Sequence, residues 1–384
     1  MTQTMRTMES RDVLLRPSPH AMVWPGIGQR HEQIAVPGVS LADGDLLVEV
    51  ELATVCGSDL HTVHGDRRST APLVLGHEQV GRIVAIGGSA VAACGTRLVV
   101  GMRVVWSVTV SCGECDRCLA GLTQKCRRLA KYGHDRVHRG WELSGGFASH
   151  VQVIAGTTVV LVDEVMPAAV AAPASCTAAT AQAALEAASA SVDLDGATVL
   201  VAGAGMLGVA ATAMAADAGA TVVVSEPDAG RRLRALEFGA AAIVDPNARG
   251  SEPSSFERVF GTLRAQGARD CAVAIEMAGT AAAVQDAYAA VDVGGVVVLA
   301  GTVSPGNEIT IDPESIVTRH LDIRGVHNYA GRHLVEAVRY LSRAWHRYPF
   351  ASLVGQTFPL ERADDALELA ATGVHHRVAL SPRL

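Results

Sequence analysis

The spacing of apolar residues changes along the chain and predicts two kinds of structure. Residues 46–52 alternate apolar and polar side chains, as a half-buried strand does. Residues 80–86 and 99–110 are further β-rich runs, interrupted by glycines. Many short strands separated by glycines predict a barrel-like β domain in the first half of the chain.

From about residue 168 the pattern becomes an alternation of helices and strands. A helix-prone, Ala-rich segment interrupted by Pro173 runs to residue 190. After it, we expect strands over 198–202, 221–225, 271–275, 296–300 and 321–326, and helices over 206–218 and 231–238. Because parallel strands need crossover helices, this order predicts a doubly wound parallel sheet. The tail, with helices expected over 334–346 and 364–372 and a strand near Thr357, should return in part to the first domain.

The composition is that of a globular protein with two domains. The chain has 384 residues, of which 49% are hydrophobic and 18% charged, and this excludes disordered, collagen-like and coiled-coil proteins. The net charge of -7 argues against a nucleic-acid binder, which needs a basic face. The sequence shows neither a secretory apolar segment nor an uninterrupted apolar stretch of membrane-spanning length, so we expect a cytoplasmic protein with no membrane contact.

A glycine-rich turn follows the first strand of the second half. Residues 203–208 have the GxGxxG spacing, in which the glycines allow a tight turn, close approach of a pyrophosphate and close packing of helix on strand. Glu226 lies eighteen residues after Gly208, where a carboxylate can accept hydrogen bonds from the ribose hydroxyls of NAD and repel the extra phosphate of NADP. The alternative is a turn without a ligand and a surface glutamate, and Arg231 leaves NADP binding open. We expect the coenzyme to be bound by Gly203, Gly205, Met206, Leu207, Gly208, Glu226 and Arg231.

Four of the eight cysteines lie within fifteen residues, at Cys112, Cys115, Cys118 and Cys126. A chain of this size in a reducing compartment does not depend on disulfides, so clustered thiols favour a metal. Four thiolates with no open position are typical of a structural zinc site, and an iron–sulfur cluster is the alternative.

A second set of ligand-type residues is dispersed. Cys56 follows the alternating strand, His77 lies in Gly-His-Glu, and Cys176 lies near the change of pattern. Two thiolates and one imidazole leave one tetrahedral position free, as a catalytic zinc requires. Taken singly, a cysteine or histidine in a strand is more often a packing residue.

Together these motifs resemble the zinc-dependent medium-chain alcohol dehydrogenase family over nearly the full chain. Residues 76–90, Gly-His-Glu-x-x-Gly-x5-Gly-x-x-Ala, are similar to the zinc signature of that family, and the thiol spacing is similar to its structural-zinc lobe. The resemblance implies an α/β two-domain fold with the active site in the cleft between the domains. A GroES-like β-barrel catalytic domain would comprise residues 1–177 and 328–384, with the zinc lobe at about 110–127. A Rossmann coenzyme-binding domain with a doubly wound parallel sheet would comprise residues 178–327.

The resemblance also assigns roles to the dispersed set. Cys56, His77 and Cys176 match the ligands of the catalytic zinc. Glu78 matches the neighbouring acid that can approach the metal. Asp59 matches the carboxylate that orients the histidine ligand.

Two further residues complete the implied active site. Ser58 matches the hydroxyl that touches the substrate oxygen, and His61 matches the outer end of a proton relay. The alternatives are a helix N-cap and a solvated histidine. Gly57 stands where several members have Arg or His against the coenzyme pyrophosphate, which leaves that contact to the helix after Gly205. The implied reaction is reversible hydride transfer from an alcohol to NAD, giving an aldehyde or ketone, with one catalytic and one structural Zn2+ per chain.

A finer resemblance concerns the substrate. Residues 106–112, 131–134 and 203–208 are similar to a sub-branch associated with phosphonate metabolism, which implies a hydroxyalkyl phosphonate as the alcohol. Its dianion needs cations near the zinc, and the candidates are Arg67, Arg68, Lys131 and His134. Alternatively these are solvated charges, and the enzyme is a polyol or secondary-alcohol dehydrogenase. A non-enzymatic binding relative is a further alternative. The family implies a homodimer or homotetramer.

Overall fold

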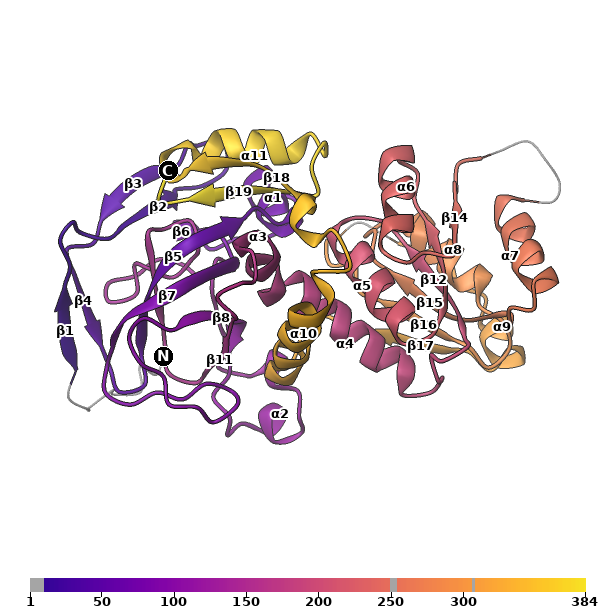
Figure 1. Cartoon of the computed structure of the whole chain (residues 1–384), viewed down its shortest axis with the longest axis horizontal. Coiled ribbons are helices and arrows are strands. Elements are labelled where there is room, and N and C mark those ends of the chain that lie inside the picture. Colours follow the sequence, from indigo (N-terminus) through magenta and orange to yellow (C-terminus); the bar gives the residue numbers. More distant parts are fainter. Residues whose placement is uncertain (1–9, 249–253, 306–307) are drawn as a thin grey trace. The chain divides into compact units, whose positions relative to one another are not determined.

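The computed structural model describes residues 10–248, 254–305 and 308–384, and the chain divides into two compact units. Unit 1 comprises Met1–Cys176, Ala330–Trp345 and Phe350–Leu384, and unit 2 comprises Thr177–Tyr329 and His346–Pro349. In Figure 1, unit 1 contains the elements from both ends of the colour bar, indigo to magenta and gold to yellow, and unit 2 contains those between them. Residues 1–9 of the expected first domain, and 249–253 and 306–307 of the expected second, lie outside the described ranges.

Unit 1 is built from strands that pair antiparallel within the described residues, except that the last two pair parallel to each other. They are β1 (Arg11–Leu14), β2 (His20–Trp24), β3 (Glu32–Ala35), β4 (Gly38–Leu41), β5 (Leu46–Thr54), β6 (Leu73–Val74), β7 (Glu78–Ile86), β8 (Arg103–Val110), β9 (Ala130–Lys131), β10 (His150–Val153), β11 (Thr157–Leu161), β18 (Val354–Pro359) and β19 (Arg377–Ser381). Within the described residues, the largest sheet has the order β11-β8-β7-β5-β19-β18, and β10 and β9 pair with β5 and β8. The helices are α1 (Gly57–His64), α2 (Asp116–Leu119), α3 (Ala168–Ala171), α10 (Gly331–Ala344) and α11 (Ala363–Ala371).

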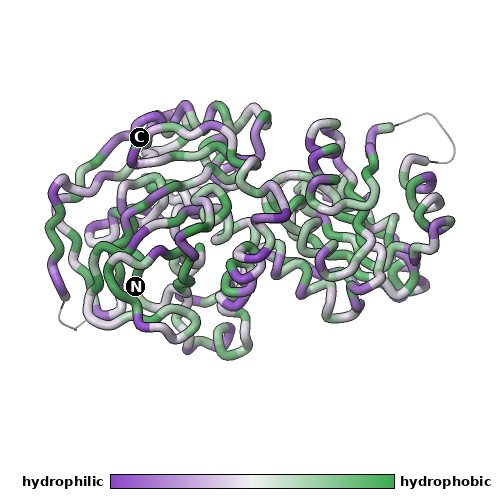
Figure 2. Tube along the Cα trace, viewed as in Figure 1, coloured by the Kyte–Doolittle hydropathy of each residue, from purple (hydrophilic) through white to green (hydrophobic). Residues whose placement is uncertain are grey.

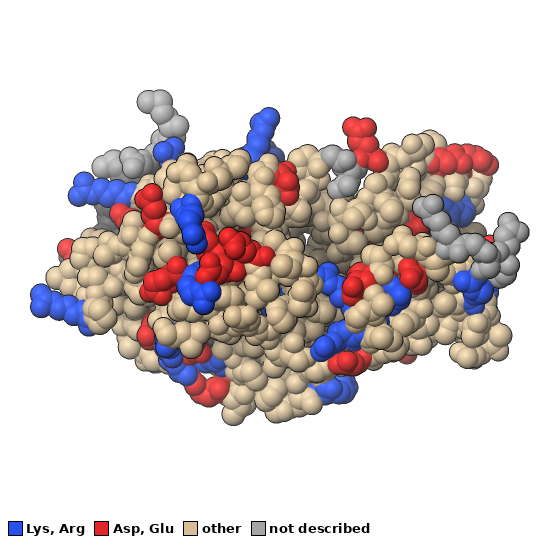
Figure 3. Space-filling view, turned by 90° about the horizontal axis from the view of Figure 1, so that it is seen from above, with Lys and Arg blue, Asp and Glu red and all other residues tan. Residues whose placement is uncertain are grey.

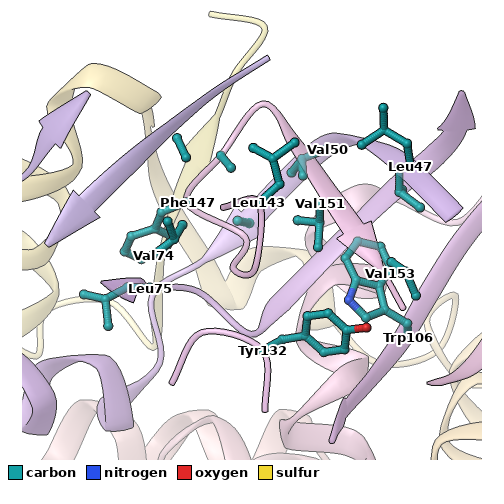
Figure 4. Packing of buried hydrophobic residues seen from close by; sticks show 14 of the residues in the cluster. Leu47, Val50, Val74, Leu75, Trp106, Tyr132, Leu143, Phe147, Val151 and Val153 are labelled. Carbon is teal, nitrogen blue, oxygen red and sulfur yellow. The ribbon is translucent and has the colours of Figure 1, made fainter. Parts of the chain in front are cut away.

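The alternating pattern of β5 explains its central place in this sheet. Val48 and Val50 are buried, whereas Glu49 and Glu51 between and after them are half-buried. Figure 4 shows Val50 of β5, Val151 of β10 and Trp106 of β8 among the apolar side chains of the unit 1 core. Burial of these apolar faces is the main stabilising contribution to the unit.

Unit 2 is a parallel sheet with helices. Its strands are β12 (Thr198–Ala202), β13 (Thr221–Ser225), β14 (Ala242–Val244), β15 (Cys271–Glu276), β16 (Val296–Leu299) and β17 (Asp322–Gly325). Its helices are α4 (Thr177–Ser189), α5 (Met206–Asp217), α6 (Ala229–Glu237), α7 (Ser255–Ala265), α8 (Ala281–Ala290) and α9 (Pro313–Thr318). Among the described residues the strand order is β14-β13-β12-β15-β16-β17, and every pairing is parallel.

The hydropathy of unit 2 follows this arrangement. The central strand β12 is buried at every position, as is typical of a sheet covered on both faces. Figure 2 shows the sheet region in hydrophobic colours, whereas α6, in which only Ala235 is buried, has hydrophilic stretches. The doubly wound sheet expected from the alternation of strands and helices is therefore present.

Some elements differ from the sequence-based expectations. The run 99–110 forms a strand only from Arg103, because Gly101 has a positive φ and residues 99–102 form a turn. The strands β1 to β4 and β19 were not expected. In the described part of the chain no helix is both long and apolar enough to cross a membrane. On the face shown in Figure 3, acidic and basic side chains are interspersed, and no broad basic field is visible there.

Candidate functional site

Cys56 lies at the junction of a strand and a helix in unit 1. β5 ends at Thr54 and α1 begins at Gly57, so Cys56 is the residue before the first helical turn. The Asp59 carboxylate accepts a hydrogen bond from the Cys56 N–H (2.9 Å). This hydrogen bond stabilises the start of α1 and fixes the backbone of Cys56 beside β7, the neighbour of β5.

Three metal-binding side chains converge at this junction. His77 directly precedes β7, and Cys176 follows the 3-10 helix Ala172–Ser175. Ser175 Oγ donates a hydrogen bond to the His77 carbonyl (3.0 Å), which ties the 3-10 helix to the start of β7. The ligand atoms of Cys56, His77 and Cys176 lie within 4.8 Å of one another. Two thiols and one imidazole at this separation fit a zinc ion with one open position.

The electrostatics of this group suit a cation. A hydrogen bond from the Cys176 thiol, and then the charge of Arg377, hold the pKa of Cys56 well below its usual value, although burial opposes them. Burial would lower the pKa of His77, but Asp59 and Cys56 raise it to about 10. Asp59 Oδ1 lies 3.3 Å from His77 Nδ1, which leaves Nε2 for a metal. Donors of this kind exchange their protons for a divalent cation.

Glu78 lies beside this group but has other partners. Its buried carboxylate accepts hydrogen bonds from Arg377 (Nε to Oε2 2.7 Å, Nη2 to Oε1 2.9 Å) and from Thr54 Oγ1 (2.7 Å). Both oxygens are therefore engaged, and the structure pairs Glu78 with Arg377 where the sequence predicted an acid that approaches the metal. Arg377 Nη2 in turn lies 3.6 Å from Cys56 Sγ. Sequence reasoning missed Arg377, because no local pattern marks a residue 299 positions from its partner.

The two expected relay residues lie on α1. Ser58 Oγ is 3.2 Å from His77 Nε2, so the hydroxyl borders the nitrogen that is free to bind a metal. The N-cap of the helix is Cys56, and the alternative role of Ser58 as the N-cap is therefore wrong. His61 is exposed, and its Nδ1 lies 2.9 Å from Asp66 Oδ2. The Asp66 carboxylate thus holds the His61 ring in an orientation in which the ring remains in contact with solvent.

Three of the four side chains expected as cations, Arg67, Lys131 and His134, gather beside His77, and we call them the cation cluster. Burial, and then the charge of Lys131, hold the pKa of His134 well below its usual value, so Arg67 and Lys131 carry the positive charge of the cluster. The ring centroids of His134 and His77 are 4.8 Å apart, and Arg67 Nη1 lies 3.5 Å from His134 Nε2. Burial, and then the charge of Arg67, lower the pKa of Lys131 to about 8. Arg68 is exposed and lies outside the cluster. Among the described residues, no carboxylate forms an ion pair with Lys131 or Arg67.

The four clustered cysteines meet in a loop around α2. Their Sγ atoms are 3.4 Å (Cys112 to Cys126), 3.5 Å (Cys115 to Cys118), 3.9 Å (Cys115 to Cys126) and 4.0 Å (Cys112 to Cys118) apart. Zinc–sulfur bonds of ~2.3 Å place tetrahedral sulfurs ~3.8 Å apart, which these separations match. In an iron–sulfur cluster the thiolates bind different irons, so four thiols around one centre favour zinc.

The glycine turn of unit 2 has the geometry that a dinucleotide requires. A Cβ on Gly208 would lie 1.8 Å from the Gly203 carbonyl oxygen, so only glycine allows α5 to approach the turn. Gly205 is the N-cap of α5, whose first residues are Met206 and Leu207. The free N–H groups at this helix start can bind a pyrophosphate.

Glu226 directly follows β13, next to this turn. It is buried, and its carboxylate accepts hydrogen bonds from Ala204 N–H (2.7 Å) and Asp228 N–H (3.0 Å). Asp228 caps the start of α6, because its Oδ1 accepts a hydrogen bond from the backbone N–H of Arg231 (2.7 Å). Glu226 therefore faces the glycine turn and also holds its backbone through the hydrogen bond from Ala204. The sequence did not indicate this second role.

Two family models match the chain. "Alcohol dehydrogenase GroES-like domain" matches residues 42–164, and "Zinc-binding dehydrogenase" matches residues 206–343. An L-threonine 3-dehydrogenase of Chelativorans sp. is 31% identical over 308 residues, which are 78% of this chain and 80% of that protein. The crystal structure of an alcohol dehydrogenase from Thermotoga maritima has a TM-score of 0.85 and 28% identity, covering 95% of this chain and 99% of that chain. A zinc-binding dehydrogenase from Sinorhizobium meliloti bound to NADP has a TM-score of 0.81 and 28% identity, with the same coverage.

These similarities confirm the expected two-domain fold, the dehydrogenase class and the use of zinc and NAD(P). The thiol lobe and the Cys-His-Cys group fit one zinc ion each. The chain belongs to the zinc-dependent medium-chain alcohol dehydrogenase family.

Proposed function

We propose that this protein oxidises a small alcohol that carries an anionic group, with a hydroxyalkyl phosphonate as the substrate, and reduces NAD+ in a reversible reaction. The observation that supports this proposal is that the group of Cys56, His77 and Cys176 lies directly beside the cation cluster. We further propose that residues 1–177 and 328–384 form the catalytic domain and residues 178–327 the coenzyme domain, and that the protein is a homodimer or homotetramer.

The proposed chemistry assigns one task to each side chain of the Cys-His-Cys group and its neighbours. A zinc ion held by Cys56, His77 and Cys176 would supply Lewis acidity, which lowers the pKa of a substrate hydroxyl. Asp59 keeps Nδ1 of His77 engaged, so that Nε2 is the nitrogen presented to the metal. Ser58 Oγ, next to that nitrogen, accepts the hydroxyl proton and passes it on.

His61 is suited to release that proton to solvent. It is exposed and its ring is held by Asp66, and an imidazole has one nitrogen that can accept a proton and one that can donate it. The substrate C–H bond then breaks with its electron pair, and the hydride reduces NAD+ to NADH. One proton and one carbonyl product balance the reaction.

The coenzyme preference is proposed from Glu226. Its oxygens retain acceptor sites beyond the hydrogen bonds to Ala204 and Asp228, and these can take the ribose hydroxyls of NAD. A 2′-phosphate would meet the same negative charge at close range. We therefore propose NAD as the preferred coenzyme, although Arg231 follows on α6.

The preference for an anionic alcohol is proposed from the cation cluster. A half-buried ammonium and a guanidinium that form no ion pair in the described chain are incompletely compensated, and a phosphonate or carboxylate would compensate both. The Chelativorans relative is named for L-threonine, which is itself an alcohol with a carboxylate.

A matched pair of substrates tests this proposal. 2-Hydroxyethylphosphonate and its neutral isostere 3,3-dimethylbutan-1-ol are compared by NADH formation, with a neutral polyol as a third substrate. We expect kcat/KM to favour the phosphonate by about 100-fold, the value of two charge-assisted hydrogen bonds. A preference for the isostere or the polyol contradicts the anionic substrate. Oxidation that persists in a zinc-depleted Cys56→Ser variant contradicts the metal-dependent mechanism itself.

A further inference from the structure

The end of β15 in unit 2 has a buried carboxylate that no sequence motif marks. Glu276 is completely buried. Its Oε1 accepts a hydrogen bond from Gly279 N–H (2.5 Å), and its Oε2 accepts from Gly301 N–H (3.2 Å), Thr302 N–H (3.0 Å) and Thr302 Oγ1 (2.9 Å). Within the described residues it forms no ion pair. These donors alone compensate the buried charge.

Glu276 lies where the strand order of the sheet reverses. From β12 the chain proceeds to β13 and β14 on one side, and then to β15, β16 and β17 on the other. In parallel α/β sheets the ligand crevice lies outside the carboxyl ends of the strands at such a reversal. At this edge Glu276 joins the loop that follows β15 to the loop that follows β16.

The loop after β15 also contacts the glycine turn after β12. Met277 N–H donates a hydrogen bond to the Ala202 carbonyl (2.8 Å). A Cβ on Gly203 would lie 2.9 Å from Ala278 N, so the loop packs directly against the first glycine of the turn. A displacement of this loop would therefore change the wall of the coenzyme crevice.

The two halves of a dinucleotide lie on opposite sides of this reversal. Glu226 marks the side of the adenosine ribose, at the end of β13, and the glycine turn takes the pyrophosphate. The other half must then extend over the ends of β15 and β16. We propose that Glu276 is a positioning residue for the nicotinamide half of the coenzyme, because it holds the two backbone loops on which this half lies. The inference rests on the coenzyme use proposed above.

A comparison of two ligands separates this role from a general effect on folding. The Glu276→Gln side chain keeps its shape, but its amide N–H2 group faces backbone N–H donors and cannot accept from them. In the zinc-loaded full chain, NADH and 5′-AMP affinities are measured by calorimetry. We expect the NADH affinity to fall about tenfold and the 5′-AMP affinity to change less than about twofold, since 5′-AMP contains only the adenosine half. We also expect KM for NAD+ to rise while kcat for a saturating alcohol changes little.

A second pair of variants keeps the test valid if Glu276→Gln does not fold. Thr302→Val removes only the Oγ1 donor, and Thr302→Ser retains it. We expect NADH affinity to fall about threefold in Thr302→Val and to be restored in Thr302→Ser. Equal losses of NADH and 5′-AMP affinity, or an unchanged NADH affinity in both Glu276→Gln and Thr302→Val, overturn the proposal. Wild-type protein that binds neither ligand overturns the coenzyme use itself, which is a different failure.

Discussion

The pair formed by Arg377 and Glu78 gives the sharpest prediction for the stability of unit 1. Arg377→Met removes two charge-assisted hydrogen bonds, of 2.7 and 2.9 Å, from a carboxylate that is 0% exposed and that also accepts from the hydroxyl of Thr54. Breaking a buried ion pair on one side costs about 3–5 kcal/mol, because the remaining buried charge loses its charged partner. The pair also attaches β19, near the end of the chain, to β7, so the loss should affect the whole sheet.

A double-mutant cycle separates the charge from the packing. Glu78→Gln removes the buried negative charge but leaves the Arg377 guanidinium without its carboxylate, so it should also cost about 3–5 kcal/mol. The double variant Glu78→Gln/Arg377→Met should be more stable than Arg377→Met alone, because a neutral amide is left in place of a bare carboxylate. Arg383→Met is the control, since its ion pair with Glu49 (3.0 Å) is exposed and contributes at most about 1 kcal/mol.

Tryptophan fluorescence during urea unfolding is the appropriate assay. All four tryptophans, Trp24, Trp106, Trp141 and Trp345, belong to unit 1, and only Trp345 directly precedes a segment of unit 2, so their signal reports mainly unit 1. Zinc-loaded proteins are compared at constant metal concentration, because loss of metal would itself destabilise the fold. An Arg377→Met variant within about 1 kcal/mol of the wild type, or a double variant less stable than Arg377→Met, would refute the reasoning.

Three further predictions concern the substrate, the proton relay and the lobe. Lys131→Met should raise KM for 2-hydroxyethylphosphonate about 10- to 100-fold, with Arg68→Met as an unaffected control. Burial, and then the charge of Arg67, lower the pKa of Lys131 to about 8. KM of the wild type for the phosphonate should therefore rise as the pH increases through that value, because Lys131 loses its proton. A KM that does not change with pH argues against this role of Lys131. Ser58→Ala should reduce kcat at least about 100-fold while zinc content by mass spectrometry stays at two ions per chain, and a small effect on kcat removes Ser58 from the relay. Cys112→Ser should leave one zinc ion per chain, measured in the same way, and lower the thermal stability; retention of two ions contradicts the tetrahedral lobe.

Local chemistry explains which elements the sequence predicts well. β12 and β13 have the predicted bounds, and α5 differs at its end by one residue, because an apolar run, a glycine turn and a helix start follow each other directly. Gly208 has a steric reason that depends only on a near neighbour in sequence, the Gly203 carbonyl oxygen. The thiol spacing of the lobe is local in the same sense. These features require no knowledge of distant segments.

Long-range partners explain what the sequence does not predict. β19 is a short apolar run that becomes a strand only because β5 and β18 pair with it. Its first residue, Arg377, reaches Glu78 only through that pairing, so no spacing rule could identify it. Likewise the sequence offered four cations for the substrate, and only the fold separates the exposed Arg68 from the cation cluster. The sequence shows which residues can carry a charge, whereas the tertiary structure decides which groups surround each of them.

Three acids near the proposed sites accept hydrogen bonds from backbone N–H groups. Asp59 accepts from the N–H groups of Cys56 and Gly76, Glu226 from those of Ala204 and Asp228, and Glu276 from those of Gly279, Gly301 and Thr302. Each carboxylate thus joins two backbone segments at a strand or helix end and holds them through its acceptor oxygens. It follows that substitution of these acids should change the affinities for metal and coenzyme, while the pH dependence of phosphonate binding should come from Lys131.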